Sequence, residues 1–351
     1  MIESSFSEQA ESDLAYQNQI LVGVSRTFAL TIPQLPDALQ DVVGNAYLLC
    51  RIADTIEDEQ YLDIEKKHQF TEFFIRVVSG EETAEKFAKE LLPLLSLEAC
   101  STNLDELDLV ENTPRVIRIT HSFTSTQRIA LERCVKIMSR GMVEFQKNSS
   151  LYGLEDLPEM ARYCYVVAGV VGEMLATLFC EYSEQIAEKE EVLQQLSVSF
   201  GQGLQMTNIL KDVWEDRKRN MCWLPRSVFA DVGFTLSDLS IDSKDQRYEQ
   251  GLTELVGVAR NHLENALRFT LLIPKHEKGI RRFCLWALAM AILSLRKIHA
   301  YPGYRSGSQV KITRRSVKLT AITMGLLASS DRMLQILFRL FTKTLPHTSQ
   351  Y

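Results

Sequence analysis

Apolar residues recur every three or four positions along most of the chain, which is the spacing of amphipathic α-helices. The stretch that opens at Pro36-Asp37 shows this period clearly, with apolar positions at Leu39, Val42, Val43, Ala46, Leu49, Ile52 and Ala53. Scarcely any stretch alternates with a period of two, and no repeat of 20–50 residues is visible. The pattern predicts an all-α protein, a single domain over residues 1–351 with a short polar connector near 301–315 before a last helix.

The same period sets the expected helix boundaries. Helices are predicted over residues 12–23, 36–58, 64–78, 84–95, 114–145, 157–179, 189–216, 244–272, 275–300 and 316–341. A polar, acidic loop is expected over 101–113. The helix after Leu157 is apolar nearly all round apart from Glu173, so we expect it to be buried. Gly169 and Gly172 within it should allow close approach by a neighbouring helix or a substrate chain.

The segment Gly201–Asp216 carries a polar stripe on a helix that is otherwise largely apolar. Read as a helix, it places four side chains with oxygen ligands three or four residues apart, where they can touch one another. We call these residues the downstream stripe: Gln205, Asn208, Asp212 and Asp216. Carboxylate and amide oxygens are the ligands that Mg²⁺ prefers, often together with substrate phosphates.

A second acidic stripe lies earlier in the chain, at the end of the helix expected from Pro36. We call it the upstream stripe: Arg51, Asp54, Glu57 and Asp58. A helix dipole disfavours carboxylates at this end. Carboxylates ~4 Å apart repel by about 1 kcal/mol in water and about 4 at a partly buried site, so both stripes in one site need divalent cations. Acidic clusters are more often solvated faces, but these residues favour metal-assisted chemistry on a diphosphate with an apolar chain.

Composition excludes several other classes of protein. A net charge of -6 disfavours a nucleic-acid surface, and no His or Cys spacing matches a zinc or di-iron site. The uncharged apolar run 283–295 is too short to span a membrane, and the polar N-terminus is unlike a leader. We expect a cytoplasmic protein with no transmembrane anchor, in contact with a membrane only at its periphery for product release. Scattered cysteines should be reduced: Cys50, Cys100, Cys134, Cys164, Cys180, Cys222 and Cys284.

At these residues the sequence resembles the squalene/phytoene synthase family of head-to-head prenyl transferases. The D-x-x-E-D motif of that family stands at Asp54–Asp58 as DTIED, and its N-x-x-x-D-x-x-x-D motif begins at Asn208. SRTF at Ser25–Phe28 is similar to the family's S-R-S/T-F segment near the substrate diphosphate. YCYVVAGVVG is similar to the family helix whose tyrosine matches Tyr163. The resemblance runs from Ser25 to about residue 300 and implies a helical bundle of the isoprenoid synthase type with a central apolar cavity.

The resemblance also implies a reaction. Two farnesyl diphosphates condense to presqualene diphosphate with Mg²⁺, and Tyr163 is the candidate that steers the proton lost. The implied metal ligands are Asp54, Glu57, Asp58, Asn208, Asp212 and Asp216. The aspartates among them are also the implied catalytic residues, together with Tyr163. The implied substrate-binding residues are Ser25, Arg26, Phe28, Tyr47, Arg51, Gln205, Asn208 and Lys211.

Within the family the chain resembles squalene synthases more than phytoene synthases. VKITRRSV at Val310–Val317 is similar to a V-K-I-R-K-G segment that is linked there with NADPH. The match is partial, because threonine, arginine and arginine stand where that segment has arginine, lysine and glycine. The implied cofactor-binding residues are Lys311, Arg314 and Arg315. A reductive second step to squalene follows from this resemblance.

Two alternatives remain open on the sequence. A phytoene- or dehydrosqualene-type synthase shares both acidic motifs but needs no hydride donor, so the basic segment Lys311–Arg315 separates the two readings. A catalytically silent helical protein that binds prenyl diphosphates or partner helices would be expected to have lost metal ligands. The full set of ligands stands in this chain, which disfavours that alternative.

Overall fold

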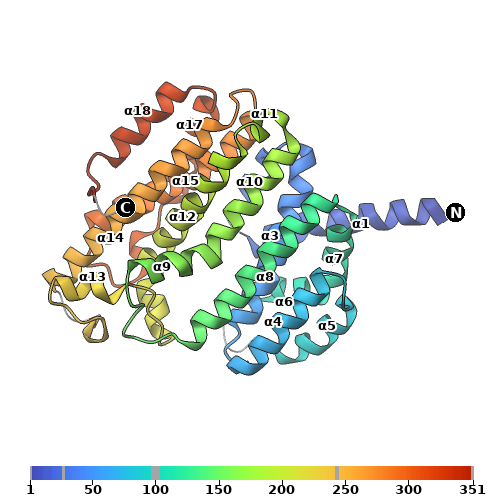
Figure 1. Ribbon diagram of the computed structural model, residues 1–351, viewed down its shortest axis with the longest axis horizontal. Coiled ribbons are helices and arrows are strands. Elements are labelled where there is room, and N and C mark those ends of the chain that lie inside the picture. The colour runs from blue at the N-terminus through green and yellow to red at the C-terminus, as the bar shows by residue number, and fades with distance from the viewer. Residues whose placement is uncertain (1, 26–27, 96–102, 242–244, 349–351) are drawn as a thin grey trace. The chain divides into compact units, whose positions relative to one another are not determined.

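The computed structural model describes residues 2–25, 28–95, 103–241 and 245–348, with side chains from residue 8 onward. Within these residues the regular elements are all helical, and an isolated parallel bridge between Leu154 and Pro225 is the β pairing present (Figure 1). The all-α class is therefore confirmed. The six described cysteines are free thiols, as expected, and Cys100 lies outside the described residues.

The chain groups into two compact units. Unit 1 comprises Met1–Lys147 with Thr177–Glu184, and unit 2 comprises Asn148–Ala176 with Gln185–Tyr351. Because two compact units can still be parts of one domain, the single domain stays a prediction.

Unit 1 is built on α3 (Asp37–Asp58), which packs against α1, α4, α6, α7 and α8. Leu48, Leu49 and Ile52 of α3 are fully buried. The other helices of the unit are α1 (Ile2–Val24), α2 (Phe28–Thr31), α4 (Ile64–Val78), α5 (Ala84–Leu91), α6 (Leu104–Glu111), α7 (Thr113–Ser122) and α8 (Ser125–Lys147).

Unit 2 is built on the long helix α12 (Glu190–Lys218), which packs against α14 (Gln246–Leu272) and α15 (Lys278–Ala300). Its other elements are α9 (Leu157–Cys164), a π-helical turn (Tyr165–Gly169), α10 (Val170–Tyr182), α11 (Glu184–Ala187), α13 (Arg226–Asp231), α16 (Gly307–Val310), α17 (Arg314–Leu327) and α18 (Asp331–Thr342). The C-terminal end of α10 from Thr177 to Tyr182, together with Ser183 and Glu184, belongs to unit 1.

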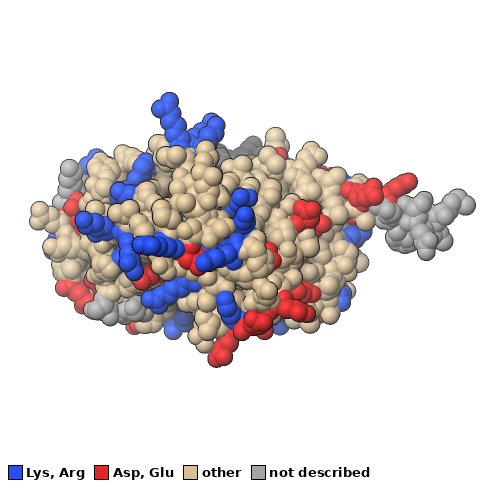
Figure 2. Space-filling model, turned by 90° about the horizontal axis from the view of Figure 1, so that it is seen from above, with Lys and Arg blue, Asp and Glu red and all other residues tan. Residues whose placement is uncertain are grey.

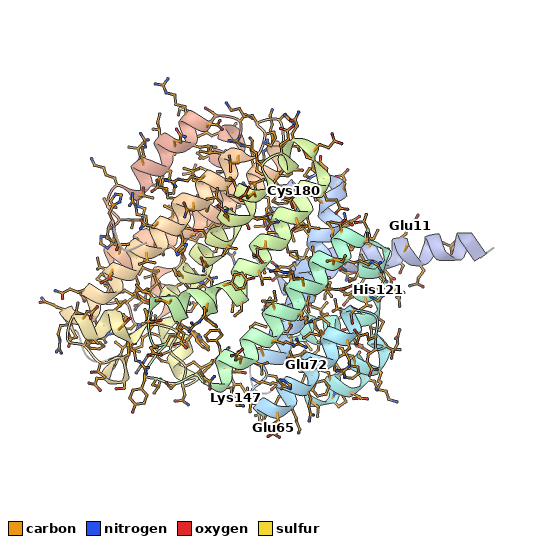
Figure 3. All side chains as sticks on the ribbon, in the orientation of Figure 1. Glu11, Glu65, Glu72, His121, Lys147 and Cys180 are labelled. Carbon is orange, nitrogen blue, oxygen red and sulfur yellow. The ribbon has the colours of Figure 1, made fainter. Side chains whose placement is uncertain are left out.

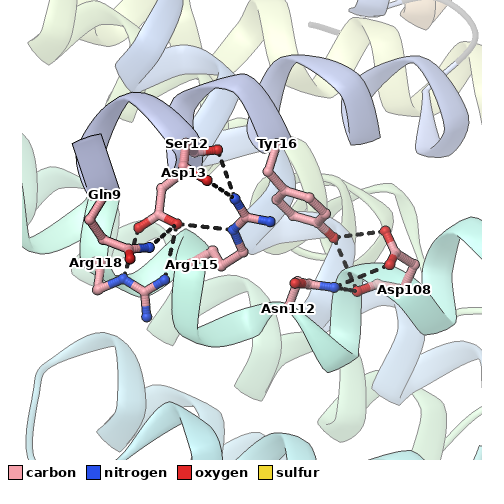
Figure 4. A network of polar contacts seen from close by, with 8 residues as sticks. All are labelled: Gln9, Ser12, Asp13, Tyr16, Asp108, Asn112, Arg115 and Arg118. Atoms are coloured by element: carbon pink, nitrogen blue, oxygen red, sulfur yellow. Dashed lines mark hydrogen bonds and ion pairs between the residues drawn. The ribbon is translucent and has the colours of Figure 1, made fainter. Parts of the chain in front are cut away.

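Polar contacts join the helices within unit 1. The buried carboxylate of Asp13 on α1 accepts hydrogen bonds from Arg115 and Arg118 of α7, at 2.8–3.0 Å (Figure 4). Glu72 of α4 and His121 of α7 are labelled in Figure 3. Glu72 accepts two hydrogen bonds from one guanidinium of α8, at 2.6 and 2.7 Å, and His121 bonds a carbonyl at the end of α4. These contacts fix the helices that surround α3.

Glycines set the spacing between α12 and the helical run that contains Tyr163. A Cβ on Gly172 would lie 2.2 Å from the carbonyl oxygen of Ser197, and one on Gly201 would lie 2.2 Å from that of Ala168. No side chain fits at either position, so the two backbones touch only because both residues are glycine. The neighbour that we expected at Gly172 is therefore α12.

The observed helices differ from the expected ones at a few places. A helix, α6, occupies the segment expected as a polar loop, and the helix expected over 114–145 is two helices that break at Phe123 and Thr124. The helix expected over 316–341 is also two, α17 and α18, separated by residues 328–330. The helix 64–78 has the expected bounds.

Two helical stretches, Leu157–Tyr182 and Lys278–Ala300, are long and apolar enough to cross a membrane by length and composition. The uncharged apolar run 283–295 within the second stretch is shorter than a membrane span. An 18-residue window of that helix that admits up to two charged residues is nevertheless long and apolar enough. Half of each window is buried inside the protein, and core helices of soluble proteins pass the same test. The expected lack of an anchor stays a prediction.

Candidate active site

The upstream stripe lies in the last two turns of α3, within unit 1. Asp54 keeps 32% of its side chain exposed, with its carboxylate 3.8 Å from a guanidinium nitrogen of Arg51. The pKa of Asp54 is raised to about 7, because burial and the nearby charges of Asp58 and Glu106 together outweigh the opposing charge of Arg51. The charge of this carboxylate is therefore poorly compensated by the protein itself, as a cation site requires.

Arg51 is anchored by a residue that the sequence did not single out. Its Nη2 donates to Glu106 Oε1, and the Glu106 side chain is only 3% exposed. The second oxygen of Glu106 accepts the backbone N–H of Asn103 at 3.0 Å, while Asn103 accepts the N–H of Glu106, which makes a capping box at the start of α6. One buried carboxylate thus caps a helix and holds the arginine of the upstream stripe.

A lysine side chain contacts the C-terminal end of α3, where the upstream stripe is acidic. The buried Lys67 donates from Nζ to the carbonyl of Glu57, and Gln146 donates to the same carbonyl at 3.2 Å. A cation at this end of a helix interacts favourably with the dipole. Lys67 therefore offsets part of the cost of ending α3 in acidic residues.

Three of the expected substrate-binding residues come together next to the upstream stripe. Ser25 Oγ accepts the backbone N–H of Phe28 at 2.9 Å, and the ring of Phe28 lies 5.3 Å from that of Tyr47. Tyr47 lies one turn before Arg51 on α3 and donates to the carbonyl of Val24 at 3.1 Å. Arg26 lies outside the described residues.

The downstream stripe lies on α12, within unit 2. Lys211 donates to Asn208 Oδ1 at 3.2 Å and lies 3.1 Å from an oxygen of Asp212. Burial raises the pKa of Asp212, Lys211 opposes this, and Glu215 adds to it. Gln205 and Asp216 are half-buried on the same helix.

The end of α12 turns the chain sharply after Asp216. Asn220 adopts a positive φ of 59°, and the N–H of Met221 donates to the carbonyl of Asp216 at 3.0 Å. Arg217 donates to the carbonyls of Leu236 and Leu239. The side chain of Arg217 thus secures the loop before α14.

The connector that precedes α17 packs on the downstream stripe. Glu215 accepts the N–H of Gly307 at 3.1 and 3.3 Å, and the indole of Trp214 donates to the carbonyl of Tyr304 at 2.7 Å. A Cβ on Gly307 would lie 3.0 Å from an oxygen of Asp212, so a larger residue would press on the stripe.

Lys311 consequently lies near the downstream stripe, where its charge lowers the pKa of Asp212 against the effect of burial. Arg314 and Arg315 are exposed in the first turn of α17, whose N-cap is Thr313. The structure therefore places one expected cofactor-binding residue, Lys311, close enough to an expected metal ligand for their charges to interact.

Tyr163, the expected catalytic tyrosine, is buried against an aromatic ring. Its ring stacks on Trp223 with centroids 4.2 Å apart and planes within 11°. Trp223 is held in place because Leu154 and Leu224 pair, with Leu154 N–H donating to the carbonyl of Leu224 at 2.9 Å. This stack fixes the plane of the tyrosine ring.

The oxygen-rich stripes suit Mg²⁺ in donor chemistry. Among the described residues no group of three His, Cys, Asp or Glu side chains is arranged to hold a metal ion. Mg²⁺ does not require such a group, because it keeps several waters and binds one or two carboxylates together with substrate phosphates. Asp54 with Asp58, and Asp212 with Asp216, each provide that number of carboxylates.

The sequence pattern of squalene/phytoene synthase matches residues 21–316 of this chain. The chain belongs to the squalene/phytoene synthase family. This family assignment covers both stripes, the SRTF segment and the helix of Tyr163. It ends at the first turn of α17, so most of α17 and all of α18 lie beyond the match.

Relatives in this family include squalene synthases of yeast and plants. The squalene synthase of Schizosaccharomyces pombe is 26% identical over 312 residues, which are 86% of this chain and 64% of the relative. That of Solanum lycopersicum is 31% identical over 281 residues, which are 79% of this chain and 62% of the relative. The chain thus spans less than two thirds of the length of either relative.

A solved structure shares the fold. The complex of TcSQS with the ligand BPH1237 aligns with 97% of this chain and 94% of its own, with a TM-score of 0.72 and 21% identity. The helical fold implied by the sequence motifs is confirmed by this likeness.

Proposed function

We propose that the protein condenses two farnesyl diphosphates to presqualene diphosphate and reduces that product to squalene, with Mg²⁺ and NADPH. The proposal is supported by family membership and by the chemistry of the two stripes. The observation that carries it is the poorly compensated carboxylate of Asp54 beside Asp58, on a helix whose apolar face is buried in the core of unit 1. If the stripe were a fully solvated acidic face, burial would not raise the pKa of Asp54.

The acidic side chains have a defined role in the proposed reaction. Asp54 and Asp58 on α3, and Asp212 and Asp216 on α12, would hold Mg²⁺ through their oxygens. Bound Mg²⁺ supplies charge neutralisation for a departing diphosphate. Lys211, which already contacts Asp212, would add a positive charge for the diphosphate oxygens.

The apolar side chains would protect the allylic cation. The backbone run from Tyr165 to Leu175 is apolar except at Glu173, and Val166, Val167 and Leu175 are only half-buried. Such a surface accepts a prenyl chain and excludes water, which would otherwise quench the cation. Tyr163 would handle the proton lost when the cyclopropane forms, with its ring held by Trp223.

The reductive step is supported by the position of Lys311. NADPH would supply the hydride, and its phosphates need cations. Lys311 near Asp212, with Arg314 and Arg315 in the first turn of a helix, provides three cations and a helix N-terminus, which binds anions favourably. Two arginines in this turn oppose the helix dipole, so their presence favours an anionic ligand.

A dehydrosqualene- or phytoene-type synthase is the second candidate. It is favoured by one observation, which is that the basic segment departs from the squalene-synthase pattern at Thr313, Arg314 and Arg315. Such an enzyme would make the first product without a hydride donor.

The proposal can be tested by release of diphosphate from farnesyl diphosphate in the presence of Mg²⁺. Asp54→Ala and Asp216→Ala are each expected to lower turnover on the order of 100-fold or more, because each removes a charge that acts in the transition state. Asp231→Ala, an exposed aspartate at the end of α13, is the matched control and should keep full turnover. Full turnover by Asp54→Ala, with circular dichroism unchanged, would refute the metal site.

A further inference from the structure

The outer face of α17 is apolar, although it lies at the surface. Leu319, Ile322 and Leu326 are 67%, 61% and 80% exposed. They are spaced three and four residues apart, so they form one stripe along the helix. None of the residues of α17 is buried.

The next helix, α18, repeats the pattern with cations added. Met333, Ile336 and Leu340 are exposed and follow the same spacing. Arg332, Arg339 and Lys343 are exposed on the same helix or directly after it. Seven of the 19 large hydrophobic side chains exposed among the described residues lie on these two helices. An exposed apolar patch of this kind, bordered by cations, marks an interaction surface.

The charge of this end of the chain is opposite to that of the rest. Residues 311–351 contain seven of the 39 Lys and Arg but only one of the 45 Asp and Glu, so they carry a net charge of +6 in a chain of -6. The single acid, Asp331, is itself paired with Arg281 and Lys275. Figure 2 looks onto the side where α17 and α18 lie in Figure 1, and Lys and Arg side chains gather there.

An apolar pocket lies beneath the two helices. It has a volume of about 280 Å³ and is lined by side chains of α14, α15, α17 and α18, among them Leu288, Ile292, Met324 and Phe338. Leu319 and Phe341, two of the exposed residues, also line it. The pocket therefore continues the apolar outer surface inward, at a size that suits part of a hydrocarbon chain.

We propose that the outer face of α17 and α18 binds the surface of an anionic lipid bilayer. Exposed Leu, Ile and Met would enter the boundary between headgroups and acyl chains, and Arg332, Arg339 and Lys343 would contact lipid phosphates, as in amphipathic helices at membrane surfaces. A second copy of this face is disfavoured as the partner, because two segments of charge +6 repel. Nucleic acid is disfavoured as the partner because its binding relies on cations that contact phosphates. The aliphatic side chains that this face exposes between its cations would have no role in such binding.

Sedimentation with lipid vesicles tests this surface with the full-length protein and no substrate. We expect binding to vesicles of phosphatidylcholine with 30% phosphatidylglycerol, weaker binding to phosphatidylcholine alone, and loss of binding as salt rises. The triple variant Arg332→Gln, Arg339→Gln, Lys343→Gln should bind these vesicles on the order of 100-fold more weakly. Each Lys or Arg near an anionic surface contributes about fivefold in affinity, and the variant removes three of them. It leaves the residues proposed to bind NADPH unchanged.

A matched control has the same net charge. Lys66→Gln, Lys89→Gln, Lys136→Gln removes three exposed cations of unit 1 and should bind as the unchanged protein does. Equal binding by this control and the α18 variant would overturn the proposal, as would failure of the unchanged protein to bind anionic vesicles.

An apolar variant separates insertion from charge. Leu319→Gln, Ile322→Gln, Leu326→Gln should weaken binding on the order of tenfold or more, whereas Ile129→Gln, at a residue of α8 that is 64% exposed, should not change it. These exposed substitutions should keep the unfolding midpoint. If the apolar variant binds normally, or if the face forms dimers that the variant abolishes without vesicles, the proposal fails. Vesicle binding without turnover would sustain this inference while the proposed function fails.

Discussion

Glu106→Gln tests whether one buried carboxylate supports the upstream stripe. The variant keeps an oxygen that can accept the N–H of Asn103 but removes the charge that pairs with Arg51. Removing one partner of a buried ion pair costs about 3–5 kcal/mol. Arg51 keeps 26% of its side chain exposed and retains Asp54 at 3.8 Å, so we expect the lower end, about 3 kcal/mol of unfolding free energy.

The measurement is urea unfolding followed by circular dichroism. Glu82→Gln is the matched control, because Glu82 pairs with Lys86 at the surface of the same unit at 3.4 Å. An exposed pair of this kind contributes less than about 1 kcal/mol. If Glu106→Gln unfolds at the same urea concentration as Glu82→Gln, the buried pair does not stabilise unit 1 and the reasoning is wrong.

Three further predictions follow from single contacts. Burial alone would raise the pKa of Asp13, but hydrogen bonds from Arg118 and Arg115 outweigh it and hold the pKa below its usual value. The ion pairs of Asp13 therefore stabilise the folded protein fully above about pH 4 and progressively less as the pH falls. Because Arg115 and Arg118 are partly exposed, Asp13→Asn should lower the unfolding free energy by about 3 kcal/mol at pH 7, the lower end for a buried ion pair. The difference should be smaller at pH 3, and an equal difference at both pH values would contradict this. Tyr163→Phe keeps the stack on Trp223 and should change stability by less than about 1 kcal/mol while lowering diphosphate release on the order of 100-fold; unchanged release would leave Tyr163 a structural role alone. Gly172→Ala places a Cβ against the carbonyl of Ser197 and should cost about 1–3 kcal/mol, so an unfolding midpoint equal to that of the unchanged protein would show that the helices can move apart.

The hydrophobic period predicted most helices, but local capping signals decided where some of them end. The helix expected over 114–145 breaks because Thr124 and Gln127 form a capping box, with each side chain accepting the other's backbone N–H at 3.2 Å. The polar segment expected as a loop is helical because Asn103 and Glu106 form another such box. Both signals stand in the sequence as a capping residue followed three positions later by Glu or Gln.

Sequence patterns could not predict the residues that hold the site in place. The stripes could be predicted because their side chains recur at helical spacing on one element. Glu106 and Arg51 are 55 residues apart, and Glu215 and Gly307 are 92 apart. No local period records such pairs, so the anchoring of Arg51 and the packing of the connector on α12 required the structure.

The central claim is tested most directly by identification of the hydrocarbon that the purified protein makes from farnesyl diphosphate and Mg²⁺, with and without NADPH. The account predicts squalene only when NADPH is present, and presqualene diphosphate without it. Dehydrosqualene formed regardless of NADPH would contradict the reductive step and the role of Lys311. Absence of any product from farnesyl diphosphate, with formation of phytoene from geranylgeranyl diphosphate, would contradict the proposed substrate.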